Sequence, residues 1–203
     1  MASVEPPRER ALSLVRMRAI EEFVSAAAAG RGLATCLLRY RVAGWNGPAA
    51  DAFADVRWSL DRIRAEHGHD VPVVLVGHSM GGRAVLRAGG EEQVAAVCAL
   101  APWTPPDEPV AHLRGRTVAI LHGRGDSWVP AALSEDFAVR AEEAGARVAR
   151  FTVAGGHSMV RRAPVWHAFV RDVVLAGAGL EPMRRDVADA LRTSGAAGLA
   201  VPL

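Results

Sequence analysis

The feature that most constrains the fold is an apolar run that leads directly into a serine flanked by glycines. Residues 71–76 are almost continuously apolar, Gly-His-Ser-Met-Gly-Gly follows at 77–82, and residues 83–88 have helical character. A strand covered on both faces gives such an apolar run. Glycine at 77 and 81 permits a sharp turn, because side chains there would collide with neighbouring backbone. The sequence therefore predicts a strand, a tight turn and a helix that together present the hydroxyl of Ser79.

Strand-like and helix-like segments alternate along the rest of the chain. Apolar residues at three- and four-residue spacing, or between turn residues, predict helices at 16–30, 49–67, 130–144, 164–175 and 181–191. Short apolar runs predict strands at 34–40, 94–100, 117–121 and 147–153. This alternation, without repeats, predicts an α/β fold with a mostly parallel open sheet and helices on both faces.

Length and local composition suggest how the chain is divided. Its 203 residues suit one domain with one sizeable core. The charged, proline-containing residues 1–10 are expected to be disordered, and residues 11–177 to form the α/β domain. Residues 178–203 are expected to form a C-terminal tail that is partly helical or loose.

Charge and composition argue against several classes of partner. The 24 basic and 22 acidic residues leave a net charge of +2, which gives no electrostatic reason to expect nucleic acid or a membrane as partner. We find no secretory signal and no apolar stretch long enough to span a bilayer, so we expect a cytoplasmic protein. Cys36 and Cys98 lie in apolar runs, and we expect them to be buried free thiols.

A serine hydroxyl becomes a useful nucleophile only when a base takes its proton, and that base is oriented by a carboxylate. His157 follows the predicted strand at 147–153, and Asp126 follows the one at 117–121. Both would lie at the carboxyl ends of strands, where sites form in such sheets. We therefore assign Ser79 as nucleophile, His157 as base and Asp126 as the orienting acid.

Other residues compete for these roles. Asp107 and Glu108 are rival acids in the preceding loop, and Asp126 could simply be a turn residue. His78 is expected to pack or hydrogen-bond within the turn, and His122 to support the site from the end of a strand. The histidines show no metal-ligand spacing with a third partner, so we expect no metal.

Three motifs together resemble the α/β-hydrolase superfamily. They are Gly-His-Ser-Met-Gly-Gly at 77–82, His-Gly followed by Asp at 122–126, and Gly-His-Ser-Met at 156–159. The resemblance extends from about residue 16 to residue 175. It implies hydrolysis through an acyl-enzyme on Ser79 without a cofactor. The substrate would be a small-molecule carboxylic ester, or a thioester or amide that the same groups would cleave.

Shorter motifs resemble an uncharacterised group of small, lidless actinobacterial hydrolases. They are Arg-Met-Arg at 16–18, Arg-Tyr-Arg at 39–41, Gly-Trp-Asn-Gly at 44–47 and Ala-Pro-Trp at 101–103. The loop at 102–115 is too short for a cap domain, which predicts an open site. Trp103 and Trp45 are expected to line this site on two sides and to contact substrate. Nothing in the sequence favours one oligomeric state.

The sequence departs from the superfamily pattern at its beginning. Members usually carry an earlier central strand that ends in a His-Gly-Gly-like turn and donates the second oxyanion N–H, but no His-Gly precedes position 122. The Met80 N–H would remain as one donor, and loss of the other would cost about 10²–10³ in rate. Three alternatives stay open: an active hydrolase, a weak or inactive binding module, and an N-terminally truncated hydrolase. The same gap predicts that the strand at 34–40 pairs directly with the strand at 71–76.

Overall fold

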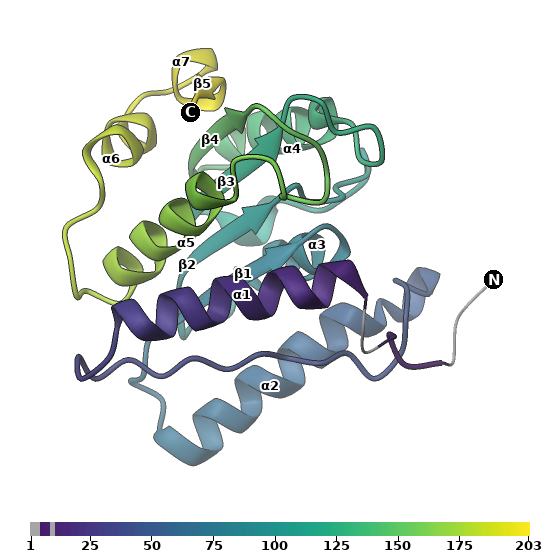
Figure 1. Ribbon diagram of the computed structural model, residues 1–203, viewed down its shortest axis with the longest axis vertical. Helices are drawn as coiled ribbons and strands as arrows, with labels where there is room; N and C mark the ends of the chain where they lie inside the picture. The colour runs from purple at the N-terminus through teal and green to yellow at the C-terminus, as the bar shows by residue number, and fades with distance from the viewer. Residues whose placement is uncertain (1–4, 9–10) are drawn as a thin grey trace.

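The computed structural model describes residues 5–8 and 11–203, and its centre is a sheet of five parallel strands. The strands lie in the order of the sequence, each hydrogen-bonded to the next. They are β1 (Val73–His78), β2 (Val94–Leu100), β3 (Thr117–Gly123), β4 (Arg147–Val153) and β5 (Val201–Pro202). The predicted parallel sheet with helices on both faces is confirmed (Figure 1).

Helices cover both faces of the sheet. They are α1 (Leu12–Ala27), α2 (Asp51–His67), α3 (Met80–Ala88), α4 (Ala131–Glu143), α5 (Ala163–Gly177), α6 (Arg185–Arg192) and α7 (Ala196–Leu199), with short 3₁₀ turns η1 (Gly47–Ala49) and η2 (Ala111–Leu113). One face packs against α2, α3 and α4, and the other against α1, α5 and α6 (Figure 1).

Alternation along the strands builds both cores at once. Successive side chains of a strand point to opposite faces. Val97 and Ala99 of β2 therefore lie in the core under α2, α3 and α4, while Cys98 and Leu100 lie in the core under α1 and α5. The central strands are buried on both faces, which explains their nearly continuous apolar sequence.

The predicted strand at 34–40 is wrong: this run is extended, but it forms no strand and does not pair with β1. It passes between α1 and α2 (Figure 1), and its polar groups bind these helices instead. Thr35 donates to Glu21 of α1, and the backbone N–H of Arg41 donates to Asp55 of α2 at 2.8 Å. β1 is consequently the edge strand of the sheet in the described part of the chain.

The prediction that Cys36 is buried is also wrong. Because the run at 34–40 lies outside the sheet, Cys36 is exposed, whereas Cys98 in β2 is buried. Both cysteines are free. Of residues 1–10, which were expected to be disordered, residues 1–4 and 9–10 lie outside the described residues.

The end of the chain is packed onto the sheet, where the sequence predicted a partly helical or loose tail. α6 and α7 provide the helical part, and β5 adds a parallel strand beside β4. Leu199 is buried in the core, and its carbonyl accepts a 2.9 Å hydrogen bond from the buried side chain of Arg150. The Gly195 N–H donates to Glu142 of α4 at 3.0 Å. These side-chain partners lie far away in sequence, which is why local composition did not predict the packing.

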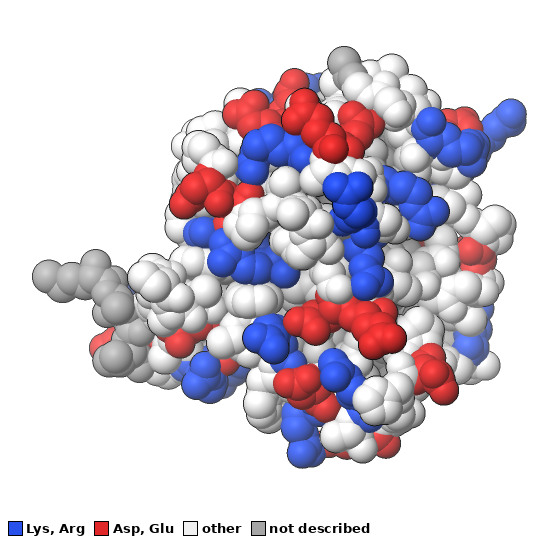
Figure 2. Space-filling model, turned by 180° about the vertical axis from the view of Figure 1, so that it is seen from behind, with Lys and Arg blue, Asp and Glu red and all other residues white. Residues whose placement is uncertain are grey.

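The surface mixes charges of both signs. Basic and acidic side chains are interspersed over the face seen in Figure 2, consistent with the nearly balanced composition. Among the described helices, none combines the length and the apolar character needed to cross a membrane.

Candidate active site

The turn between β1 and α3 holds Ser79 in an unusual backbone conformation. Its φ is 56° and its ψ is −119°, which is strained for a residue with a side chain. Neighbouring backbone fixes it: the Ser79 N–H donates to Leu100 O at 2.9 Å, and the Ser79 carbonyl accepts from Trp103 N at 3.1 Å. The serine therefore lies at the carboxyl end of β1, directly before the first turn of α3.

Both flanking glycines lie where a side chain would meet close neighbours. A Cβ on Gly77 would lie 2.3 Å from the carbonyl oxygen of Gly81, a distance that real Cβ atoms do not adopt. A Cβ on Gly81 would lie 3.0 Å from the hydroxyl of Tyr40. The tight turn leaves the N–H groups at the start of α3, including that of Met80, without helical partners.

Two glycine-rich loops bring the candidate acid and base together. The Gly125 N–H donates to Gly155 O, and the Arg124 N–H donates to Val153 O, each at 2.9 Å. A Cβ on Gly123 would lie 2.6 Å from Gly155 O. The loops after β3 and β4 therefore touch through backbone, and this contact sets the distance between Asp126 and His157.

His157 lies between Ser79 and Asp126. Its Nδ1 lies 2.7 Å from Asp126 Oδ2, and its Nε2 lies 2.8 Å from Ser79 Oγ. An ionised carboxylate only accepts hydrogen bonds, so Nδ1 carries the proton. Nε2 of the neutral imidazole then has a free lone pair, and the Ser79 hydroxyl donates to it.

Asp126 is held in its charged form. Burial raises the pKa of its carboxyl, but hydrogen bonds from the Val129 N–H, His157 and the Trp128 N–H outweigh this effect, so that the pKa lies below its ordinary value. The two backbone N–H groups donate to Oδ1, Trp128 at 3.0 Å and Val129 at 2.9 Å. The carboxylate is thus fixed by one oxygen and presents the other to His157.

His122 contacts Asp126 and supports it, as the position of His122 at the end of β3 suggested. It is fully buried, and its Nε2 lies 3.0 Å from Val129 O and 3.3 Å from Asp126 Oδ2. The carbonyl only accepts, so Nε2 carries the proton, and Nδ1 lies 2.8 Å from Ser134 Oγ. Burial lowers the pKa of His122, which keeps the ring neutral.

His78 contacts the candidate base from the other side. Its Nε2 donates to the carbonyl oxygen of His157 at 2.9 Å, and the two rings lie 4.7 Å apart between centroids. Burial, together with the nearby His157, lowers the pKa of His78 to about 4. The sequence predicted that His78 would pack or hydrogen-bond within the turn; its hydrogen bond instead joins the end of β1 to the loop after β4.

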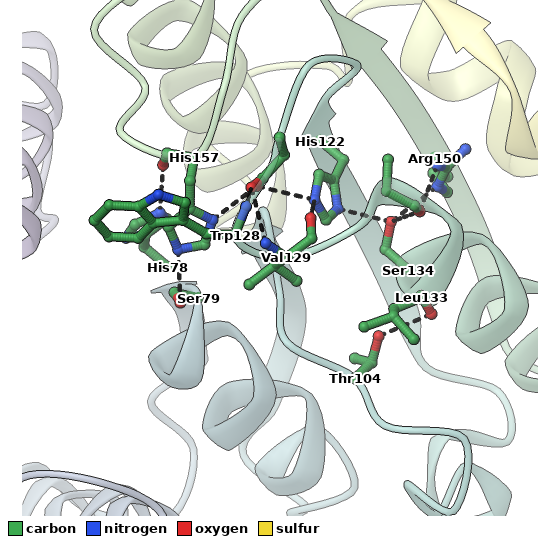
Figure 3. A network of polar contacts seen from close by, with 12 residues as sticks. His78, Ser79, Thr104, His122, Trp128, Val129, Leu133, Ser134, Arg150 and His157 are labelled. Carbon is green, nitrogen blue, oxygen red and sulfur yellow. Dashed lines mark hydrogen bonds and ion pairs between the residues drawn. The ribbon is translucent and has the colours of Figure 1, made fainter.

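Trp128 was not predicted from the sequence to be a residue of the site. Its indole is 80% exposed and stacks on the imidazole of His157, with centroids 5.7 Å apart and an angle of 30° between the rings (Figure 3). A large apolar residue two positions after the candidate acid was the available signal. Its exposed ring offers apolar surface to a ligand at the site.

The rival acids lie elsewhere. The side chain of Glu108 is fully buried and is paired with Arg83 and Arg87 of α3. Asp107 is exposed at the rim of a neighbouring cleft. Among the described residues, no group of three His, Cys, Asp or Glu side chains has an arrangement that could hold a metal ion.

The cleft beside the serine contains both tryptophans that the sequence proposed for substrate contact. It has a volume of about 1160 Å³ and is lined by Met80, the loop around Trp45 and the loop around Trp103. Trp103 is 37% exposed, whereas Trp45 is 8% exposed and lies largely beneath the side chain of Arg83. Trp103 therefore has surface free for contact, and Trp45 acts chiefly as a support.

The sequence of this chain matches a known family. A sequence model of the Alpha/beta hydrolase family matches residues 15–202, so this chain belongs to the α/β-hydrolase family. No match was found among curated protein sequences.

Several solved structures share the fold at low sequence identity. A putative α/β hydrolase of unknown function from Agrobacterium tumefaciens is 15% identical, with a TM-score of 0.63, covering 82% of this chain and 80% of that one. An esterase of Pyrococcus furiosus is 13% identical, with a TM-score of 0.65, covering 83% and 76%. An α/β serine hydrolase homologue from Coxiella burnetii is 15% identical, with a TM-score of 0.61, covering 82% and 80%. At these identities the similarity establishes the fold.

Proposed function

We propose that this chain is a serine hydrolase that cleaves a carboxylic ester through an acyl-enzyme on Ser79. The observation that carries the proposal is the position of His157, within hydrogen-bond distance of both Ser79 Oγ and an ionised Asp126. Three groups in this order match the requirement for an activated serine nucleophile. Thioesters and amides use the same groups and are alternatives for the scissile bond.

The reaction has two halves. Ser79 Oγ attacks the acyl carbon while its proton passes to His157 Nε2, and Asp126 stabilises the imidazolium that forms. The Met80 N–H, at the start of α3, donates to the developing oxyanion. His157 then gives the proton to the leaving alcohol. A water molecule, deprotonated by the same His157, hydrolyses the acyl-enzyme and frees Ser79.

The proposed substrate contacts follow from the exposed aromatic surface. Trp128 offers its ring above His157, and Trp103 forms part of the wall of the cleft beside Met80. The loop at 102–115 contains only the short turn η2, which suits an open site that admits a small-molecule ester. A cytoplasmic location remains part of the proposal, from the sequence.

Labelling with a fluorophosphonate tests the proposal. We expect one covalent adduct by intact mass on the wild-type chain, and none on Ser79→Ala. Ser158→Ala is the matched control, because Ser158 is exposed and adjacent to His157, and it should label like the wild type. A cooperatively folded wild type that does not label would contradict an active hydrolase and favour the binding-module alternative.

A further inference from the structure

The cleft beside Met80 contains an arginine arrangement that the proposed reaction does not use. Arg83 lies one helical turn after Ser79 on α3, about 6 Å along the helix axis. Its guanidinium carbon lies 3.8 Å from the centroid of the Trp45 ring and 4.7 Å from that of Trp103. Two indole rings therefore lie within cation–π distance of one guanidinium.

Positive charge exceeds negative charge in the cluster around Arg83. Arg83 Nε donates to Glu108, and Arg87 Nε donates to the other oxygen of the same carboxylate at 2.6 Å. The Glu108 side chain is fully buried, so a single carboxylate serves two guanidinium groups. The cluster of Arg83, Arg87 and Glu108 therefore keeps one positive charge in excess. Asp107 also lines the cleft, but it is exposed at the rim, where water screens its charge.

Two nitrogen atoms of the Arg83 guanidinium are available as hydrogen-bond donors. Its side chain is only 8% exposed, yet neither Nη1 nor Nη2 has a hydrogen-bond partner among the described residues. Neither atom is among the fully buried groups without a partner, so both reach the solvent of the cleft. Two coplanar N–H donors at the end of a guanidinium match the two oxygens of a carboxylate.

We propose that this cleft binds a carboxylate group of the substrate through Arg83, with Arg87 adding to the positive charge. The inference rests on the proposed function and narrows its substrate class to esters that carry a carboxylate a few bonds from the scissile carbonyl. The stacking tryptophans hold the guanidinium in place before binding, which lowers the ordering cost of the contact. The carboxylate can belong to the acyl part or to the alcohol part of the ester.

A matched pair of esters tests the inference on the wild-type chain. The 4-nitrophenyl monoester of glutaric acid carries an acyl-side carboxylate, and its methyl ester lacks the charge. The butyryl ester of glycolic acid and its methyl ester form the alcohol-side pair. We expect kcat/KM about tenfold or more higher for the charged member of one pair, and this preference should weaken with added salt. Equal kcat/KM within both pairs would overturn the inference.

Variants connect the preference to Arg83. Arg83→Gln should reduce kcat/KM more for the charged ester than for its neutral partner, and Arg83→Lys should retain part of the preference because it keeps charge but not the planar donors. Arg62→Gln is the control, because Arg62 is an exposed, ion-paired arginine on α2. An equal reduction for both esters would show that Arg83 only supports the fold. Arg87→Gln, which leaves Arg83 paired with Glu108, replaces Arg83→Gln if that variant does not fold.

Equilibrium binding separates this inference from the proposed function. Ser79→Ala should bind monomethyl glutarate in a calorimetric titration, and Ser79→Ala with Arg83→Gln should bind it at least about tenfold more weakly. Labelled Ser79 without any charge preference or carboxylate binding would overturn the inference and leave the hydrolase standing. Carboxylate binding without labelling would support the cleft and contradict the hydrolase.

Discussion

His122 and His157 share one carboxylate oxygen. His122 Nε2 lies 3.3 Å from Asp126 Oδ2, and His157 Nδ1 lies 2.7 Å from the same atom. The second oxygen of Asp126 is occupied by two backbone N–H groups. The direction of the carboxylate is therefore set by three groups besides the candidate base, and His122 is the only side chain among these three.

Replacing His122 should slow the chemical step. In His122→Phe the ring volume is largely kept, but the hydrogen bonds to Asp126 and Val129 O are lost. A hydrogen bond to a charged group contributes about 1.5 kcal/mol, so we expect a roughly tenfold lower kcat, with little change in KM. Steady-state kinetics on a 4-nitrophenyl ester measures both constants.

His112→Phe is the matched control for this variant. The His112 ring also lies 3.0 Å from a backbone carbonyl, that of Leu86, but it does not contact the candidate triad. It should lose stability while kcat stays unchanged. If both variants lower kcat equally, His122 has no specific role in positioning Asp126.

Trp128 should contribute to substrate binding and little to stability. Its ring is 80% exposed, so Trp128→Ala removes little buried surface. We expect KM for 4-nitrophenyl esters to rise about three- to tenfold, in line with about 1 kcal/mol for one aromatic contact. The melting temperature should stay within about 2 °C of the wild type.

A second exposed tryptophan provides the comparison for Trp128. Trp58 on α2 is 62% exposed and lies outside the residues that form the site. Trp58→Ala should leave KM unchanged. The same KM for both variants would remove Trp128 from the substrate-binding surface.

The site could be predicted from sequence where backbone geometry dictates the residue type. Gly77 is required by its close contact with the Gly81 backbone, and Gly81 lies against the Tyr40 hydroxyl, so a short motif carries enough information to locate Ser79. The loops that hold Asp126 and His157 are also rich in glycine for a steric reason, at Gly123. Local sequence therefore indicated three residues that the structure brings together, and their roles as nucleophile, acid and base belong to the proposed function.

Features that depend on distant contacts could not be predicted in this way. Residues 34–40 have the composition of a strand, but Thr35 binds Glu21 instead of lying in the sheet. β5 pairs with β4, and Leu199 O just before it is bound by Arg150, which lies 49 positions away. The pairing of Arg83 with Trp45 and Trp103 joins three separate segments. In each case a partner that is distant in the sequence determines the local structure. The sequence near the residue does not indicate which partner it has.

The buried histidine His78 predicts a loss of stability in mild acid. Its pKa is about 4 in the folded protein and 6.5 when unperturbed, so the unfolded chain binds a proton first as the pH falls. The free energy of unfolding should decrease between pH 6.5 and pH 4, by up to about 3 kcal/mol from this group. Below pH 4 this contribution is constant, whereas Asp126, whose pKa is lowered, begins to contribute a further loss there.

Urea unfolding as a function of pH measures this loss. His78→Gln cannot gain a proton, so its free energy of unfolding should depend less on pH between 6.5 and 4. Part of the dependence remains, because His122 is also buried with a lowered pKa. Parallel pH profiles for the wild type and His78→Gln would exclude His78 as the source.

Arg150 should anchor the C-terminal segment to the sheet. This buried side chain on β4 donates to Leu199 O and Ala131 O, each at 2.9 Å, and to Ser134 Oγ at 3.1 Å. Arg150→Met would fill similar space but leave the Leu199 carbonyl unpaired, whereas the Ala131 carbonyl keeps its partners within α4. An unpaired buried group costs about 1–3 kcal/mol, so we expect a loss of about 2 kcal/mol in the free energy of unfolding.

Hydrogen exchange gives the spatial part of that prediction. Amide protection in β5 and α7 should fall more than protection in β1 and β2, because the lost contact is specific to the C-terminal segment. Arg147→Met is the control, since Arg147 lies on the same strand but is exposed, and within the described part of the chain its side chain donates only to Thr117 Oγ1. That variant should change the free energy of unfolding by less than about 0.5 kcal/mol. A uniform loss of protection across the sheet in Arg150→Met would mean that Arg150 stabilises the whole fold and does not anchor β5 in particular.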